Sequence, residues 1–111
     1  MACRKMLGSF VDSMADLRRK LAVGISYEEY LGEVQELRAI YAAIPSERLG
    51  LGCLLAAGTP GERALNRYMA AANDWGECLT DAGCETAMVE PKLQREWARA
   101  SALLGTAQAG I

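Results

Sequence analysis

Apolar residues near the start of the chain recur at alternating intervals of four and three positions, and this spacing constrains the fold more strongly than any other feature. Residues at these intervals lie on one stripe of an α-helix. The stripe consists of Cys3, Leu7, Phe10, Met14, Leu17 and Leu21. Glycine readily adopts the left-handed conformation that ends many helices. We therefore expect an amphipathic helix that ends at Val23 and is capped by Gly24.

Start and stop signals delimit a second helix between Ser26 and Pro45. Ser26 and Glu29 match the capping box, in which the two residues satisfy free backbone donors of the first turn reciprocally. Pro45 ends the helix because proline has no backbone N–H and its ring blocks the preceding turn. The apolar stripe comprises Tyr27, Tyr30, Leu31, Val34, Leu37, Ile40, Tyr41 and Ile44.

The segment 46–58 is predicted to form a short helix, or a helical turn followed by one. Ser46 is suited to cap it and Gly58 to end it, whereas Gly50 and Gly52 weaken its middle. The same two glycines are suited to a close approach between backbones.

Two longer helices are expected in the remainder of the chain. Thr59-Pro60-Gly61-Glu62 predicts a helix start with Thr59 as its cap, and a turn at 81–83 follows that helix. The last helix is expected to begin near Glu90-Pro91 and to end at Gly110. The two stripes consist of Leu65, Tyr68, Ala72, Trp75 and Leu79, and of Leu93, Trp97, Ala100, Leu104 and Ala107.

These elements predict an all-α fold with a single domain over residues 1–111. Long helices joined by short connections favour an antiparallel bundle, here of four main helices plus one short helix. The composition agrees, since half of the residues are apolar and few are β-branched. One alternative stays open: a stripe, most naturally that of the N-terminal helix, packs against a second chain.

The charges of the chain are balanced, with 12 basic and 14 acidic residues. The basic run Arg18-Arg19-Lys20 falls at a predicted helix end, where cations complement the helix dipole. Nucleic-acid binding requires an excess of positive charge, which this chain does not have, so we expect no nucleic-acid partner. No apolar run is long enough to predict a transmembrane segment.

Four cysteines in a short chain without histidine are typical of a disulfide-linked extracytoplasmic domain. Of the three pairings, we favour Cys78–Cys84, which closes a small loop, and Cys3–Cys53. A buried free thiol at Cys3 and an intermolecular Cys3–Cys3 bond are alternatives. Zinc is a rival use of the cysteines, but structural zinc sites take ligands in close pairs that are absent here, so no metal or cofactor is expected. A cytoplasmic protein with four reduced thiols is the alternative localisation.

The absence of histidine restricts catalysis. It removes the commonest general base and excludes serine–histidine and cysteine–histidine nucleophiles within this chain. The glutamates 29, 33 and 36 recur at helical spacing, as expected of a solvated helix face. The sequence therefore predicts a protein without catalytic residues, and a small enzyme that uses tyrosine or carboxylate chemistry is the remaining alternative.

Aromatic residues with polar tips lie on the predicted inward stripes. Each buried hydroxyl or indole N–H needs a hydrogen-bond partner. These residues therefore belong either to an ordinary core or to a pocket that binds a small apolar or aromatic ligand. The candidate pocket residues are Tyr30, Tyr41, Tyr68, Trp75 and Trp97.

Several short motifs are spread over most of the chain: Ser26-Tyr27-x-x-Tyr30, Cys53, residues 62–68, Trp75-x-x-Cys78, Cys84, and Leu93-Gln94-x-x-Trp97-x-x-Ala100. With them the chain resembles small alanine-rich helical domains of uncharacterised exported proteins and lipoproteins of actinobacteria. The resemblance implies a secreted or membrane-tethered setting, with disulfides at Cys53, Cys78 and Cys84. It implies no catalytic residue. Cys3 behind Ala2 is then also open to interpretation as the remnant of a lipoprotein cleavage site.

The function expected from the sequence is a non-enzymatic extracytoplasmic interaction module that binds a protein partner or a second copy of itself. The alternative is a helical bundle that binds a small molecule or lipid in an aromatic-lined pocket.

Overall fold

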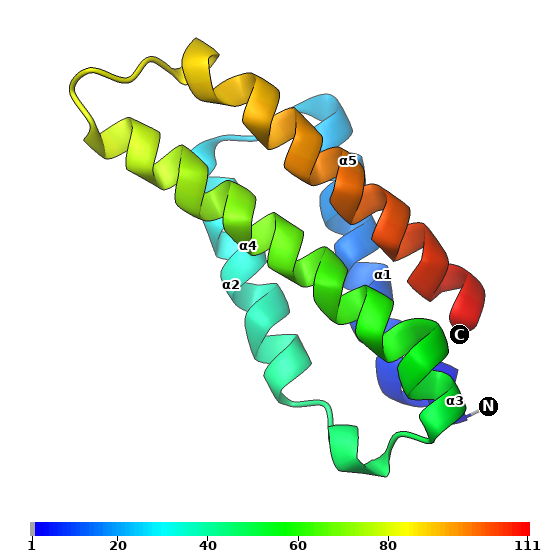
Figure 1. The fold of residues 1–111 in the computed structure, drawn as a ribbon. Coiled ribbons are helices and arrows are strands. Elements are labelled where there is room, and N and C mark those ends of the chain that lie inside the picture. Colours follow the sequence, from blue (N-terminus) through cyan, green and yellow to red (C-terminus); the bar gives the residue numbers. More distant parts are fainter. Residues whose placement is uncertain (1) are drawn as a thin grey trace.

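Four long helices run in alternating directions along the bundle (Figure 1). The structure is a computed structural model that describes residues 2–111. The four helices are α1 (Ala2–Val23), α2 (Tyr27–Ala42), α4 (Thr59–Thr80) and α5 (Thr86–Gly110). A 3-10 turn η1 (Ser46–Arg48), the short helix α3 (Leu51–Cys53) and the π-helical turn η2 (Leu54–Gly58) connect α2 to α4. The described chain contains no strand, which confirms the predicted all-α bundle.

The helix ends follow the predicted signals at the first connection. Gly24 has a φ of 106°, the left-handed conformation expected at the end of α1. The backbone N–H of Glu29 donates to the Ser26 hydroxyl over 3.1 Å, and the Glu29 carboxylate accepts from the Ser26 backbone N–H. This capping box confirms the predicted start of α2.

Helices α4 and α5 share the most extensive interface, and α1 and α2 complete the bundle (Figure 1). The molecule is elongated, with extents of 49 × 22 × 21 Å. The middle of the apolar stripe of α1 is buried inside the bundle, whereas Cys3 and Leu21 at its ends are partly exposed. The largest fully buried side chains are Leu7, Phe10, Val11, Met14, Leu17, Tyr30, Tyr68 and Leu104.

The predicted helix start at Thr59 agrees with the start of α4, but Thr59 does not cap it, because the backbone is already helical from Leu51. Gly58, expected to end the preceding helix, has ordinary α-helical angles. In a regular α-helix the Pro60 ring would clash with the carbonyl of Ala56. The wider π-helical turn of η2 avoids this clash, so Pro60 is accommodated without a break in the helical backbone.

The close backbone approach also lies elsewhere than expected. A side chain at Gly50 or Gly52 would meet no other atom within 4 Å. A Cβ at Gly110 would instead collide with the carbonyl group of Ala56. The end of α5 therefore packs directly on the backbone of η2.

Helix α5 begins at Thr86, before the start that was expected near Glu90, and Pro91 lies inside it. At this earlier start the backbone N–H of Glu85 donates to the Met88 sulfur over 3.4 Å, and the backbone N–H of Met88 donates to the Glu85 carbonyl over 2.8 Å. Leu79, predicted to be on the buried stripe of α4, is 51% exposed, because the disulfide-bonded Cys78 occupies the buried position.

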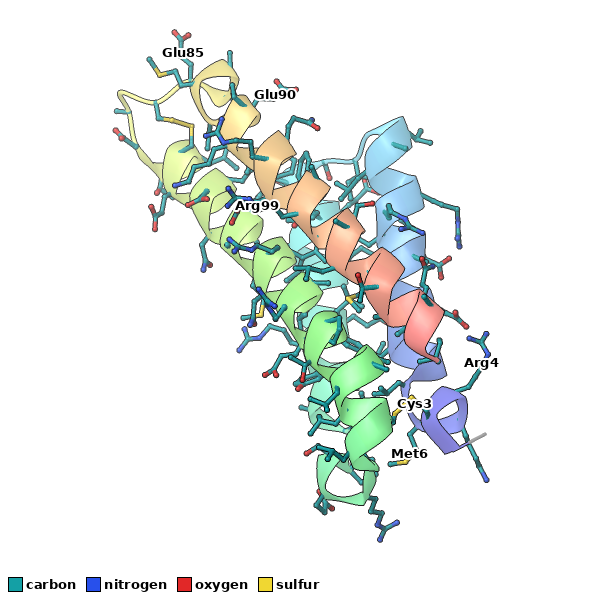
Figure 2. All side chains as sticks on the ribbon, turned by 45° about the vertical axis from the view of Figure 1, so that its right-hand side comes forward. Cys3, Arg4, Met6, Glu85, Glu90 and Arg99 are labelled. Carbon is teal, nitrogen blue, oxygen red and sulfur yellow. A yellow bond between two sulfur atoms is a disulfide. The ribbon has the colours of Figure 1, made fainter. Side chains whose placement is uncertain are left out.

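Both predicted disulfides are present: Cys3–Cys53 and Cys78–Cys84, with Cα–Cα distances of 5.4 and 5.2 Å. The first lies at the end of the bundle near α3, and the second closes the α4–α5 turn at the other end (Figure 2). This pairing is incompatible with a free thiol at Cys3, an intermolecular Cys3–Cys3 bond or a zinc site made by the cysteines. None of the helices in the described chain has the length and hydropathy that crossing a bilayer requires.

Candidate functional site

Three of the five predicted aromatic residues meet where α2, α4 and α5 come together. The ring centroids of Tyr30 and Trp75 are 5.8 Å apart, those of Tyr30 and Trp97 5.6 Å, and those of the two tryptophans 6.1 Å. Tyr27 adds an edge-on contact to Trp75 at 5.4 Å. Such tilted and T-shaped arrangements are favourable for aromatic rings. We call these four residues the aromatic cluster.

The polar tips of the aromatic cluster are joined by hydrogen bonds. Trp97 Nε1 donates to the Tyr30 hydroxyl over 3.0 Å, and this hydroxyl donates to the backbone carbonyl of Tyr68 over 2.6 Å. Burial strongly raises the pKa of Tyr30, so its hydroxyl stays protonated as a donor. These two bonds link α5 to α2 and α2 to α4, and they hold the Trp97 ring in one orientation.

Tyr68 differs from Tyr30 because its own hydroxyl is unpaired. The residue is only 1% exposed, and no donor or acceptor within residues 2–111 is placed to bond the hydroxyl oxygen. Burial raises its pKa to about 12, against the opposing effect of the positive charge of Arg18. A buried, unpaired hydroxyl costs about 1–3 kcal/mol.

Two adjoining cavities form a crevice between the C-terminal part of α1 and the first half of α5; we call it the α1–α5 crevice. The upper cavity lies nearer the start of α5 and has a volume of about 310 Å³. The lower cavity lies farther along α5 and has a volume of about 220 Å³. Both are lined by Leu21, Ala22, Gln94 and Trp97. The upper cavity is completed by Val23, Gly24, Ile25, Trp75, Thr86, Glu90 and Leu93, and the lower cavity by Arg18, Tyr68 and Ala98.

The crevice combines aromatic and aliphatic walls with a few polar groups. Trp75 and Trp97, the only tryptophans of the chain, both contribute to it. In the lower cavity, Arg18 reaches out to Gln108, whose side-chain oxygen accepts its hydrogen bond over 3.3 Å. Apolar walls with a small number of directed polar groups are typical of sites that bind small molecules.

The structure separates Tyr41 from the other predicted pocket residues. Its ring lies 5.1 Å from that of Phe10, and it lines a different cavity of about 170 Å³ that includes Leu54. Burial, followed by the charge of Glu62, raises the pKa of Tyr41. Tyr30 and Tyr41 are eleven positions apart, about 16 Å along a helix, which places them toward opposite ends of α2.

Sequence reasoning missed the α1 side of the site. The sequence predicts Arg18 as a partner of the helix dipole, and no sequence pattern indicates Ala22 as a site residue. The apolar stripe predicts that Leu21 is buried. A pattern within one helix does not specify which neighbouring helix the exposed part of the Leu21 side chain faces. The pairing of α1 with α5 supplies this information.

A second apolar region lies at the opposite end of the bundle. A groove of about 530 Å³ runs between α1 and α2, with Met6, Phe10 and Ile44 in its walls and cationic residues at Lys5 and Arg48. Nearby, three leucines of α3 and η2 are solvent-exposed, with Leu51 at 71% and Leu55 at 64%. We call Leu51, Leu54 and Leu55 the leucine patch.

Within residues 2–111, no three cysteine, aspartate or glutamate side chains are grouped so that they could hold a metal ion. Comparisons with protein-family models, curated proteins and solved structures found no match to this chain.

Proposed function

We propose that this protein is a non-enzymatic extracytoplasmic binding module that holds a small apolar or aromatic molecule in the α1–α5 crevice. One observation carries the proposal: both tryptophans line this crevice together with Tyr68, whose buried hydroxyl is unpaired. Of the two functions expected from the sequence, ligand binding is therefore the one that the geometry favours.

The hydroxyl of Tyr68 is the main reason to distinguish a binding site from ordinary packing. Nearly all buried polar groups in proteins have a partner, and Tyr30 and Trp97 obey this rule. The hydroxyl oxygen is covered by protein atoms, so a ligand in the lower cavity would supply the partner that Tyr68 lacks after neighbouring side chains move aside. The unpaired group is then understandable as part of a site that is completed on binding.

The proposed location is outside the cytoplasm, either secreted or tethered to a membrane. Two disulfides indicate an oxidising environment, since cytosolic thiols are normally kept reduced. The resemblance to exported helical domains supports the same setting.

Intrinsic fluorescence tests the proposal directly, because both tryptophans lie in the crevice. We expect the neutral probe N-phenyl-1-naphthylamine to change tryptophan emission saturably. Trp97→Leu should weaken binding at least tenfold while far-UV circular dichroism shows an intact fold. Tyr41→Phe, which lies outside the crevice, is the matched control and should bind normally. Absence of saturable binding by the parent protein, or unchanged binding by Trp97→Leu, would contradict the proposal.

The leucine patch favours self-association as a second candidate function. Exposed leucines at adjacent helical positions are unusual on a monomer surface and typical of contact sites. We expect a dimer in sedimentation equilibrium that the double substitution Leu51→Ser and Leu55→Ser dissociates. Leu79→Ser, an exposed leucine at the far end of α4, should leave the dimer intact. A monomeric parent protein at high concentration would rule this candidate out.

A further inference from the structure

We infer that the ligand of the α1–α5 crevice is an apolar monocarboxylate, with its acid group between Arg18 and the Tyr68 hydroxyl and its apolar body along Trp97. This inference rests on the proposed function and specifies the chemical class of the ligand.

The first argument is the pairing of the basic run at the end of α1. Arg19 forms an ion pair with Asp16, and Lys20 with Glu33 over 2.9 Å. Arg18 lies between Leu17 and Arg19, lines the lower cavity, and bonds only the neutral side chain of Gln108. Among the described residues no carboxylate lies within ion-pair distance of Arg18. The cation that faces the crevice is thus the one member of the run without an anionic partner.

The second argument is the convergence of donors in the lower cavity. Arg18 offers only N–H donors, and the buried, unpaired Tyr68 hydroxyl becomes a further donor once a ligand displaces the atoms that cover it. Arg18 and Tyr68 both line this cavity, and the positive charge of Arg18 acts to lower the pKa of Tyr68. Arginine and a hydroxyl donor together suit a carboxylate, whose two oxygens accept charge-assisted hydrogen bonds. No aspartate or glutamate of the described chain lines this cavity to compete for them.

The third argument gives the orientation and the number of acid groups. From the lower cavity, the shared wall of Leu21 and Trp97 leads into the upper cavity, where Ile25 and Trp75 continue the apolar surface. The upper cavity carries the carboxylate of Glu90, which lies toward the turn end of α5 (Figure 2). A second negative charge on the ligand would be repelled there, so a monocarboxylate fits better than a dicarboxylate.

The test compares octanoate with 1-octanol, which share a chain length and differ in the acid group. Tryptophan emission is titrated with each compound at pH 7 and low ionic strength. We expect octanoate to bind about tenfold more tightly than 1-octanol, as charge-assisted hydrogen bonds predict. Added NaCl should weaken the binding of octanoate and leave that of 1-octanol unchanged.

Variants locate the acid group. Arg18→Gln and Tyr68→Phe should each remove most of the preference for octanoate while retaining 1-octanol binding. Arg19→Gln, the neighbouring cation that is paired with Asp16, is the matched control and should keep the preference. An unchanged preference in Arg18→Gln would overturn the placement of the acid.

The outcomes separate the two proposals. Equal binding of octanoate and 1-octanol, lost for both in Trp97→Leu, would reject the carboxylate and keep the crevice as a binding site. If neither compound binds and N-phenyl-1-naphthylamine also fails to bind, the crevice is not a ligand site and both proposals fall.

Discussion

At the scale of single residues, Tyr30 and Tyr68 illustrate two opposite uses of a buried phenol. The Tyr30 hydroxyl accepts from Trp97 and donates to a backbone carbonyl, so it contributes to the fold. The Tyr68 hydroxyl has no partner in the described chain and contributes only the cost of its desolvation. Residues that weaken a fold yet face a crevice are characteristic of binding sites.

Removing the two hydroxyls should therefore have opposite effects on stability. We expect Tyr68→Phe to raise the free energy of unfolding by about 1 kcal/mol, since an unpaired buried group is removed. Tyr30→Phe should lower it by about 1–2 kcal/mol, because it leaves Trp97 Nε1 without a partner and removes the bond to the Tyr68 carbonyl. Urea denaturation of both variants measures the two changes. A loss of stability in Tyr68→Phe would show that its hydroxyl has a partner, such as a buried water.

The same two tyrosines predict how stability depends on pH. Their pKa values are raised in the folded state, to about 12 for Tyr68, whereas an unfolded tyrosine titrates near 10. Between about pH 10 and 12 the unfolded chain therefore binds fewer protons than the folded one, and stability falls as pH rises. We expect the urea midpoint to stay level up to about pH 9 and to decline above pH 10. Tyr68→Phe should show a shallower decline; an identical slope would contradict the assignment.

At the scale of elements, the end of α5 packs against η2 in the middle of the α3–η2–α4 segment. Residues Leu54–Gly58 form a wide turn, and Gly110 lies against the backbone of that turn. The absence of a side chain at Gly110 is what allows this approach. One residue without a Cβ thus allows two distant segments to pack.

A matched pair of glycines on α5 tests this contact. We expect Gly110→Ala to lower stability by about 1 kcal/mol, because its Cβ would overlap the Ala56 carbonyl. Gly105→Ala faces open space within the same helix and should raise stability by about 0.5–1 kcal/mol. Thermal denaturation of the two variants gives the comparison. Stabilisation by both substitutions would mean that the end of α5 does not pack on η2.

The elements differ in how well the sequence predicts them. Caps such as Ser26–Glu29 and stripes such as that of α1 are local patterns, so they could be predicted from neighbouring residues. Thr59-Pro60 predicts the start of α4, but this local signature does not reveal that α3 and η2 lead into α4 without a break. For the candidate site, the aromatic residues could be predicted because they lie on buried stripes. The separation of Tyr41 and the contribution of Arg18 depend on which helices are neighbours.

At the scale of the whole molecule, a disulfide secures each end of an elongated bundle. Cys3–Cys53 spans a sequence separation of 50 residues and Cys78–Cys84 a separation of 6. The loop-entropy relation gives about 4 kcal/mol for the first and about 2 kcal/mol for the second. The long-range bond is thus expected to carry more of the stability.

Paired substitutions measure the two contributions. Replacing both Cys3 and Cys53 by serine should lower the denaturation midpoint more than replacing both Cys78 and Cys84. Binding of N-phenyl-1-naphthylamine should survive the first change, because Cys3 and Cys53 do not line the α1–α5 crevice. Guanidinium denaturation and the fluorescence titration provide the two readouts. A larger loss from the short-loop pair would contradict the entropic estimate.

The unequal spans of the two disulfides also set the order in which they can form. Cys78 and Cys84 need only the turn between α4 and α5 to meet, and short-range contacts of this kind form early in folding. Cys3 reaches Cys53 only when α1 has docked beside η2, so the long bond closes over an assembled bundle. We therefore expect the Cys3–Cys53 bond to form after the helices have docked, and then to stabilise the native topology covalently.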